Sequence, residues 1–252
     1  MRGAAAVLLA ALTFPSFGSG ASAATRQKSV LFVLSGADHI TGKDGKPHRT
    51  GYWLEEFSVP YLLLRQSGVR IAVATPKGNR PSADPASLSA GERAALKLKA
   101  RVLDRGPILS LAKLDAETLA GFDAVFFPGG HAPMEDLAVD ARVGKLLRAF
   151  HVQGKTTALV CHGPIALLSA AAGEDFPYRG YKVTAFSDSE EKGSEVGSHL
   201  RTTPEAALQK AGALFVKGPD WAPHVVEDRE LITGQNPASS QAVAEAILRR
   251  LE

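Results

Sequence analysis

Short apolar runs alternate with longer amphipathic stretches along nearly the whole chain, and this alternation limits the possible folds more than any other feature. Four runs are apolar on both faces and predict buried strands at 29–35, 69–74, 122–127 and 156–160. A strand that is buried on both faces needs cover on both sides, so we expect a mostly parallel sheet between two layers of helices.

The remaining pattern extends this arrangement to the C-terminal end. It predicts helices at 52–68, 91–105, 138–153, 163–172, 203–211 and 237–251, strands at 181–186 and 213–216, a hairpin within 225–232, and loops at 36–51 and 79–89. No internal repeat or long linker divides the chain. We therefore expect one α/β domain, a flavodoxin-like three-layer sandwich with a mostly parallel central sheet.

The N-terminal residues follow a different pattern. A positive start at Arg2 precedes an apolar run at 4–14, and small residues follow, ending in Ala21-Ser22-Ala23. This three-part layout is typical of a secretory signal peptide, and a short N-terminal helix is the alternative. We expect residues 1–23 to be a cleavable signal peptide, residues 24–252 to be the domain, and the protein to be periplasmic or secreted.

The charge pattern does not favour nucleic acid or membrane as a partner. The chain has 29 Lys and Arg residues against 26 Asp and Glu residues, a small excess of positive charge. Basic residues recur every fourth position from Arg93 to Arg105, which favours a solvated helix face over a nucleic-acid patch. No apolar run reaches the 18 residues that a membrane-spanning helix needs.

The only cysteine, Cys161, lies in the stretch ALVCHGP between a predicted strand and a predicted helix. That position is the setting of a nucleophile elbow, and a helix N-terminus is expected to lower the pKa of the thiol. The backbone N–H of His162 and one from 127–131 (FPGGH) can face a developing oxyanion, because both segments leave strands at the same sheet edge. The alternative is a small buried apolar side chain, as most free cysteines are.

Four separated motifs resemble the ThiJ/PfpI superfamily of class I glutamine amidotransferase-like proteins. They are VCHGP at 160–164, FPGGH at 127–131, TGYWLEE at 50–56 and LITGQNP at 231–237. The resemblance spans about residues 29–251 and is nearest to the branch that holds heat-shock chaperones and glyoxalase III enzymes. It implies an enzyme without a cofactor, and a homodimer.

The resemblance also implies roles for individual residues. Cys161 matches the family nucleophile, His162 the histidine after it, and Glu56 the acid that approaches the thiol. A carboxylate after the next strand orients the histidine in this branch; Glu191 is the first match, with Glu190 and Asp188 as alternatives. The substrate-side loop at the oxyanion position corresponds to Gly129, Gly130 and His131. Ala132-Pro133 departs from the pattern, because the branch often has glycine after that histidine.

The histidines do not predict a metal site. The seven of them are scattered, no H-x-H or H-E-x-x-H pattern occurs, and there is no second cysteine. His39 and His48 share one predicted loop, where a weak surface site is the only metal-binding alternative.

The resemblance favours a cofactor-independent enzyme of the glyoxalase III or D-lactate dehydratase type. Such an enzyme converts methylglyoxal or related 2-oxoaldehydes to 2-hydroxy acids through the cysteine, so a small reactive carbonyl compound is the expected partner. The alternatives are a stress chaperone that binds unfolded proteins, and a deglycase or small-amide hydrolase whose partners include glycated proteins. Chaperone activity should survive replacement of Cys161 by serine, whereas catalysis should not.

Overall fold

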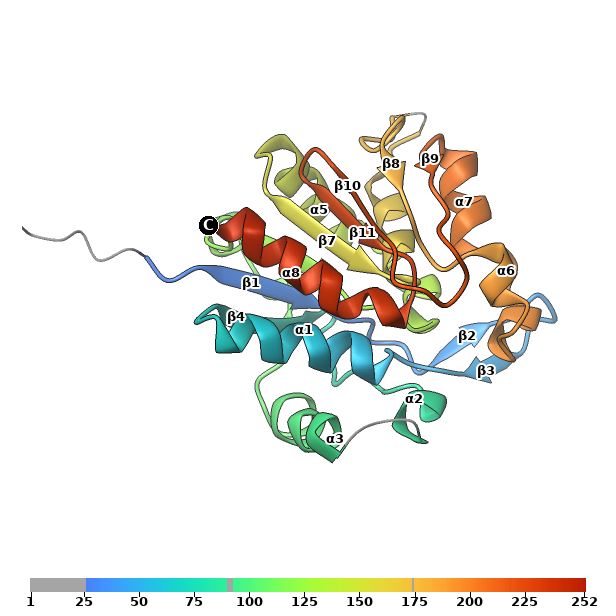
Figure 1. Cartoon of the computed structure of the whole chain (residues 1–252), viewed down its shortest axis with the longest axis horizontal. Coiled ribbons are helices and arrows are strands. Elements are labelled where there is room, and N and C mark those ends of the chain that lie inside the picture. Colours follow the sequence, from blue (N-terminus) through green and yellow to red (C-terminus); the bar gives the residue numbers. More distant parts are fainter. Residues whose placement is uncertain (1–25, 90–92, 174) are drawn as a thin grey trace, which may run out of the picture.

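The computed structural model describes residues 26–89, 93–173 and 175–252, so the predicted signal peptide lies outside the described residues. A seven-stranded sheet forms the centre of the molecule in the order β10-β11-β7-β6-β1-β4-β5 (Figure 1). Its strands are β1 (Ser29–Val33), β4 (Arg70–Thr75), β5 (Leu109–Ser110), β6 (Ala124–Phe127), β7 (Thr156–Val160), β10 (Val225–Asp228) and β11 (Leu231–Gly234). All neighbours pair in parallel except β10, which is antiparallel to β11 at the edge.

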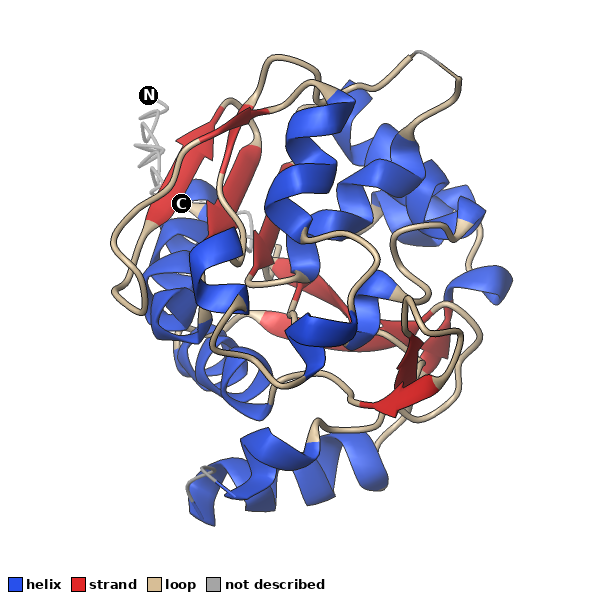
Figure 2. Ribbon diagram, turned by 90° about the vertical axis from the view of Figure 1, so that its right-hand side faces the viewer, coloured by secondary structure: helices blue, strands red, loops and turns tan. Residues whose placement is uncertain are grey.

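Helices cover both faces of this sheet (Figure 2). One face packs against α1 (Leu54–Gln66) and α8 (Ser240–Leu251), and the other against α5 (Ala141–Val152) and the 3-10 helix Gly163–Ala170. Side chains of β1 alternate between the two cores as strand geometry requires: Phe32 lies in the α1–α8 core and Leu31 in the α5 core. The expected flavodoxin-like sandwich is confirmed.

The other α-helices of the described residues are short or peripheral. They are α2 (Pro85–Ser89), α3 (Arg93–Lys99) continued by the π-helix Ala100–Asp104, α4 (Ala116–Ala120), α6 (Asp188–Glu191) and α7 (Pro204–Ala211). Among the described residues, no helix is long and apolar enough to cross a membrane.

Three local predictions are wrong. The expected loop at 36–51 contains a hairpin, β2 (His39–Thr41) and β3 (Pro47–Arg49), and the expected loop at 79–89 contains α2. The strand expected at 181–186 does not join the central sheet: β8 (Lys182–Val183) pairs with β9 (Leu214–Phe215) in a separate two-stranded sheet. The edge beside β11 is taken by β10, because a tight hairpin pairs neighbouring segments at little cost in loop closure.

Candidate active site

Cys161 lies at a sharp turn directly after β7. Its φ of 58° is in the left-handed region, which is unfavourable for a residue with a side chain. Two backbone hydrogen bonds hold this conformation: Cys161 donates to the carbonyl of Gly234 at 2.9 Å and accepts from the N–H of Phe186 at 2.9 Å. The nucleophile elbow expected from the sequence is therefore present in the backbone.

Gly163 makes the turn possible. A Cβ at this position would lie 2.4 Å from the carbonyl oxygen of Phe127, which belongs to the neighbouring strand. We expect Gly163→Ala to destabilise the protein by roughly 1–3 kcal/mol, because backbone must move to relieve the clash. Chemical denaturation measures the effect, with Gly121→Ala as the control at an exposed helix end; equal stability of the two variants would contradict the close approach.

His162 connects the thiol to a buried carboxylate. Its Nδ1 lies 3.2 Å from Sγ of Cys161, and its Nε2 lies 2.8 Å from Oε2 of Glu191. The other oxygen of Glu191 lies 2.8 Å from Nε2 of His131, so one carboxylate holds two imidazoles. The side chains of His162, Glu191 and His131 are all buried.

The charges of this group follow from its geometry. Burial by itself would raise the pKa of Glu191, but the imidazoles of His162 and His131 lower that pKa well below its usual range. Burial and the neighbouring His131 lower the pKa of His162, so the ring is neutral at neutral pH. Because the ionised Glu191 requires a donor, the proton of His162 lies on Nε2, and Nδ1 is free to accept the thiol proton.

Glu56 approaches the thiol from α1. Its side chain is fully buried, and Oε2 accepts a hydrogen bond of 2.6 Å from the N–H of Gly129. Burial raises the pKa of Glu56 to about 8, although the nearby Cys161 thiol and a hydrogen bond from the Gly129 amide lower it in part. The carboxyl is therefore protonated at neutral pH and can donate to sulfur.

The expected lowering of the thiol pKa is wrong for the free protein. Burial raises the pKa of Cys161 well above its usual value, and the nearby Glu56 carboxyl raises it further, whereas the Gly130 amide lowers it. Desolvation thus outweighs the helix N-terminus. The thiol is protonated at rest, and a thiolate forms only by transfer of its proton to an adjacent base.

The two glycines of the substrate-side loop have different surroundings. The N–H of Gly129 is used by Glu56, whereas the N–H of Gly130 is directed at Cys161. Gly130 has a φ of 77°, and a Cβ there would lie 2.3 Å from the carbonyl oxygen of Gly51. A side chain at Gly129 would lie 2.6 Å from the N–H nitrogen of His162. Gly130 is therefore the member of this pair whose amide can meet an oxyanion.

The structure separates the three acids that the sequence left open. Glu191 contacts His162, while Asp188 accepts a hydrogen bond from Thr203 on the exposed side of α6. Glu190 forms a capping box with Ser187, the residue that caps α6. The S-x-x-E pattern at 187–190 is the sequence signal that would have assigned Glu190 to the cap. Ala132 and Pro133, the departure from the family pattern, begin a short 3-10 turn directly after His131.

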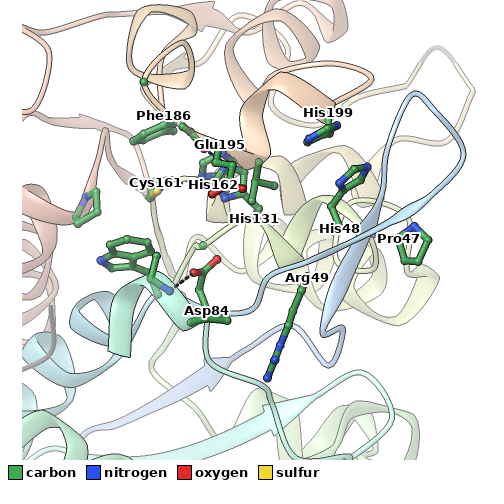
Figure 3. A pocket seen from close by; sticks show the side chains of 18 of the residues that line it. Pro47, His48, Arg49, Asp84, His131, Cys161, His162, Phe186, Glu195 and His199 are labelled. Atoms are coloured by element: carbon green, nitrogen blue, oxygen red, sulfur yellow. Dashed lines mark hydrogen bonds between the residues drawn. The ribbon is translucent and has the colours of Figure 1, made fainter. Parts of the chain in front are cut away.

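A cavity of about 590 Å³ opens above the thiol. Figure 3 shows Cys161, His162 and His131 close together on its floor, with Phe186 beside them and His48 and His199 at a distance. Trp53 and Trp221 also line the cavity. Ser194, whose hydroxyl lies 3.2 Å from Nε2 of His131, was not among the predicted site residues, because nothing in its local sequence pattern marks it.

Two groups of described residues have the composition of a metal site. The first is His131, His162 and Glu191, in which the carboxylate already holds both imidazoles at hydrogen-bonding distance. The second is Asp44, His48 and His199 near the pocket mouth. The rings of His48 and His199 stack 3.6 Å apart at 18°, so their in-plane lone pairs do not converge on one point.

The surface pair suggested by the sequence does not form. His39 lies against Asp38 with a separation of 2.8 Å, and the ring nitrogen of His48 instead lies 3.0 Å from Asp44. Neither interaction joins the two histidines.

Comparisons with known proteins agree with this fold and its motifs. The protein/nucleic acid deglycase HchA of Pseudomonas aeruginosa is 29% identical over 238 residues, which cover 89% of this chain and 81% of that relative. The rapid encystment protein of Francisella tularensis superposes with a TM-score of 0.80 at 27% identity, over 90% of this chain and 100% of that chain. Glyoxalase III from Candida albicans shares the fold, with a TM-score of 0.75 at 24% identity over 89% and 98% of the two chains.

A family model provides the assignment that the motifs led us to expect. The model described as the DJ-1/PfpI family matches residues 50–250, which include Glu56, Cys161, His162 and Glu191. The Pseudomonas aeruginosa relative is an enzyme by its name, which agrees with the enzyme that the motifs led us to expect. The chain therefore belongs to the DJ-1/PfpI family.

Proposed function

We propose that this protein is a glutathione-independent glyoxalase that converts methylglyoxal and related 2-oxoaldehydes to 2-hydroxy acids. One observation carries the proposal: a neutral base, Nδ1 of His162, and a protonated acid, Glu56, both meet the same thiol at an elbow. The thiol can lose a proton to one group while the other stabilises the thiolate or protonates the substrate.

The first chemical step is addition of the thiol to the aldehyde. His162 takes the proton of Cys161, sulfur forms a bond to C1, and the aldehyde oxygen becomes a hydroxyl after accepting a proton. The amides of Gly130 and His162 are the donors for the developing oxyanion. The product of this step is a hemithioacetal.

The second stage is an internal oxidation and reduction. Whichever of Glu56 and His162 gave its proton to the aldehyde oxygen is now a base. It removes the proton from C1, and a proton returns at C2 through an enediol. C1 is oxidised by two electrons and C2 is reduced by two, so no external redox partner is required. Water then forms a C–O bond, the C–S bond of the thioester breaks, and the thiol is restored.

The direct test is loss of methylglyoxal in the presence of purified protein, without glutathione and with a metal chelator. We expect stoichiometric appearance of lactate, and a stereospecific lactate assay decides whether D-lactate is formed. Loss of methylglyoxal without lactate, or no loss at all, would overturn the proposal.

Glu191→Gln provides a test of the buried carboxylate. An amide cannot accept from both His162 and His131, so the tautomer and orientation of His162 are no longer held. We expect kcat to fall by about 100-fold with KM changed little. Asp188→Asn, on the same helix but without contact to His162, is the matched control and should keep wild-type kcat. Equal effects of the two changes would remove Glu191 from the mechanism.

Removal of carbonyl adducts from proteins is the second candidate. The deglycase name of the Pseudomonas aeruginosa relative and the open cavity above Cys161 favour it. The same thiolate would attack the carbon derived from the aldehyde, and the amine would leave with the proton from His162 or Glu56. N-acetyl-lysine treated with methylglyoxal is the test substrate. Release of its free amine faster than the adduct dissociates spontaneously distinguishes this activity from glyoxalase activity, which removes only free methylglyoxal.

A further inference from the structure

Glu190 is a fully buried carboxylate that the proposed mechanism does not use. Oε2 accepts from the N–H and hydroxyl of Ser187 and from the amide of Gln235, at 2.8–3.1 Å. Oε1 accepts from the N–H of Trp221 and the side-chain amide of Asn236, both at 2.8 Å. Five donors from three separate segments thus converge on one side chain, more than a helix cap requires.

The N–H of Trp221 belongs to a residue with an unusual backbone. Its φ of 62° lies in the left-handed region, where a bulky side chain is a strained exception. Burial of the indole does not offset this backbone strain, since 56% of the residue is exposed. The indole lines the cavity above Cys161. A strained backbone that places a large apolar ring in solvent at a pocket indicates a role in binding.

The indole continues an aromatic row that begins at the catalytic histidine. Phe186 stacks on the ring of His162 at 4.8 Å and 29°, and Trp221 meets Phe186 edge-on at 5.6 Å and 71°. A Cβ on Gly193 would lie 3.3 Å from the indole, so the ring rests against that backbone. We call the pair Phe186 and Trp221 the aromatic wall.

The cavity is larger than a three-carbon substrate requires. Its volume of about 590 Å³ lies in the range of roughly 300–1,000 Å³ typical of sites for much larger ligands. Methylglyoxal has only one methyl group that can contact the aromatic wall. A planar ring on the same 2-oxoaldehyde could stack on the wall while its aldehyde carbon meets Cys161.

We propose that the aromatic wall makes 2-oxoaldehydes with an aromatic or similarly bulky apolar substituent the preferred substrates, and that Glu190 is the positioning residue that holds Trp221 in place. This inference rests on the proposed glyoxalase function and narrows its substrate class.

Kinetics with phenylglyoxal and methylglyoxal test the wall. We expect Trp221→Gly to lower kcat/KM for phenylglyoxal about 10-fold more than it lowers kcat/KM for methylglyoxal, mainly through KM. Glycine accepts a left-handed φ, so the backbone is preserved. Trp221→Phe should restore most of the preference. Initial rates at short times avoid modification of arginines by phenylglyoxal.

Glu190→Gln tests the positioning role with the same pair of substrates. The amide replaces one acceptor oxygen by a donor, so at least two of the five donors lose their acceptor. We expect the KM for phenylglyoxal to rise severalfold more than the KM for methylglyoxal, with Glu245→Gln on the exposed face of α8 as the control. A purely structural role would lower both activities in parallel with thermal stability, and that result would overturn the assignment of Glu190.

A binding measurement separates this inference from the proposed function. The corresponding products, mandelate and lactate, are titrated by calorimetry into wild type and Trp221→Gly. We expect mandelate to bind wild type at least about 10-fold more tightly than lactate, and to lose that advantage in the variant. If neither aldehyde is turned over, the glyoxalase proposal fails, but this titration still decides whether the aromatic wall favours binding of an aromatic ligand. If lactate is formed but mandelate binds no better than lactate, the wall is overturned and the glyoxalase remains.

Discussion

Replacement of Cys161 by serine is expected to lower kcat/KM for methylglyoxal by at least about 1,000-fold. The hydroxyl is a much weaker nucleophile and a much weaker acid than the thiol, so transfer of its proton to the neutral His162, whose Nδ1 lies 3.2 Å from Sγ, is much less favourable. The small change in size at a buried position leaves the fold intact. Lactate formation measures the effect, and circular dichroism checks the fold.

The Cys161→Ser variant also distinguishes enzymatic activity from chaperone activity. Cys161 is the only cysteine, so the serine variant is free of thiols and any remaining activity is independent of sulfur chemistry. Suppression of aggregation of an unfolded client should be unchanged in the variant if the protein acts as a chaperone. Retention of more than a tenth of the glyoxalase activity would exclude Cys161 as the nucleophile.

Replacement of Glu56 by glutamine is expected to lower kcat by about 1,000-fold with the thiol still in place. Glutamine keeps an oxygen to accept from Gly129 and has the shape of the protonated carboxyl, but it cannot transfer a proton. Wild-type activity should also fall as pH rises through about 8, because the pKa of Glu56 is raised to about 8 by burial and its acid form is then lost. The residual activity of Glu56→Gln should not show this decrease as pH rises through about 8.

Stability provides an independent check on Glu56. Its pKa in the folded protein is raised from 4.5 to about 8, so its contribution to stability is complete below about 4.5 and is lost as pH rises through about 8. We expect the unfolding free energy of wild type, relative to Glu56→Gln, to decrease by up to about 1.4 kcal/mol per pH unit across that window. Urea denaturation at several pH values measures the difference. A constant difference would mean that Glu56 is not protonated in the folded state.

The residues of the site differ in how far the sequence could identify them. Cys161, His162 and Gly163 are consecutive and follow an apolar strand, so the elbow is a local property of the chain. Glu56 and the loop at 127–131 lie far apart, and only their match to family motifs brought them together before the structure did. The homodimer, the signal peptide and the export of the protein stay predictions.

Charge states could not be predicted in the same way. The helix N-terminus at Cys161 pointed to a lowered thiol pKa, but the structure places the sulfur in a dry site beside Glu56, and burial raises that pKa. Likewise Glu190 and Glu191 are neighbours with the same side chain, yet one caps α6 and anchors Trp221 while the other holds His162. The S-x-x-E pattern marks Glu190 as the cap of α6, but its contact with Trp221 depends on the direction of side chains from segments that are distant in the chain.

The sequence by itself determined the sandwich and the elbow, because both follow from local periodicity: strands that are apolar on both faces require two layers of helices, and a strand-to-helix turn at Cys161 requires the glycine that follows. The tertiary structure alone decided that β8 and β9 leave the central sheet and that Trp221 lies over the pocket. It also separated Glu191, the first match to the family pattern, from Glu190 and Asp188 as the partner of His162. These outcomes depend on burial and on contacts between segments distant in the chain, and neither has a periodic signal in the sequence.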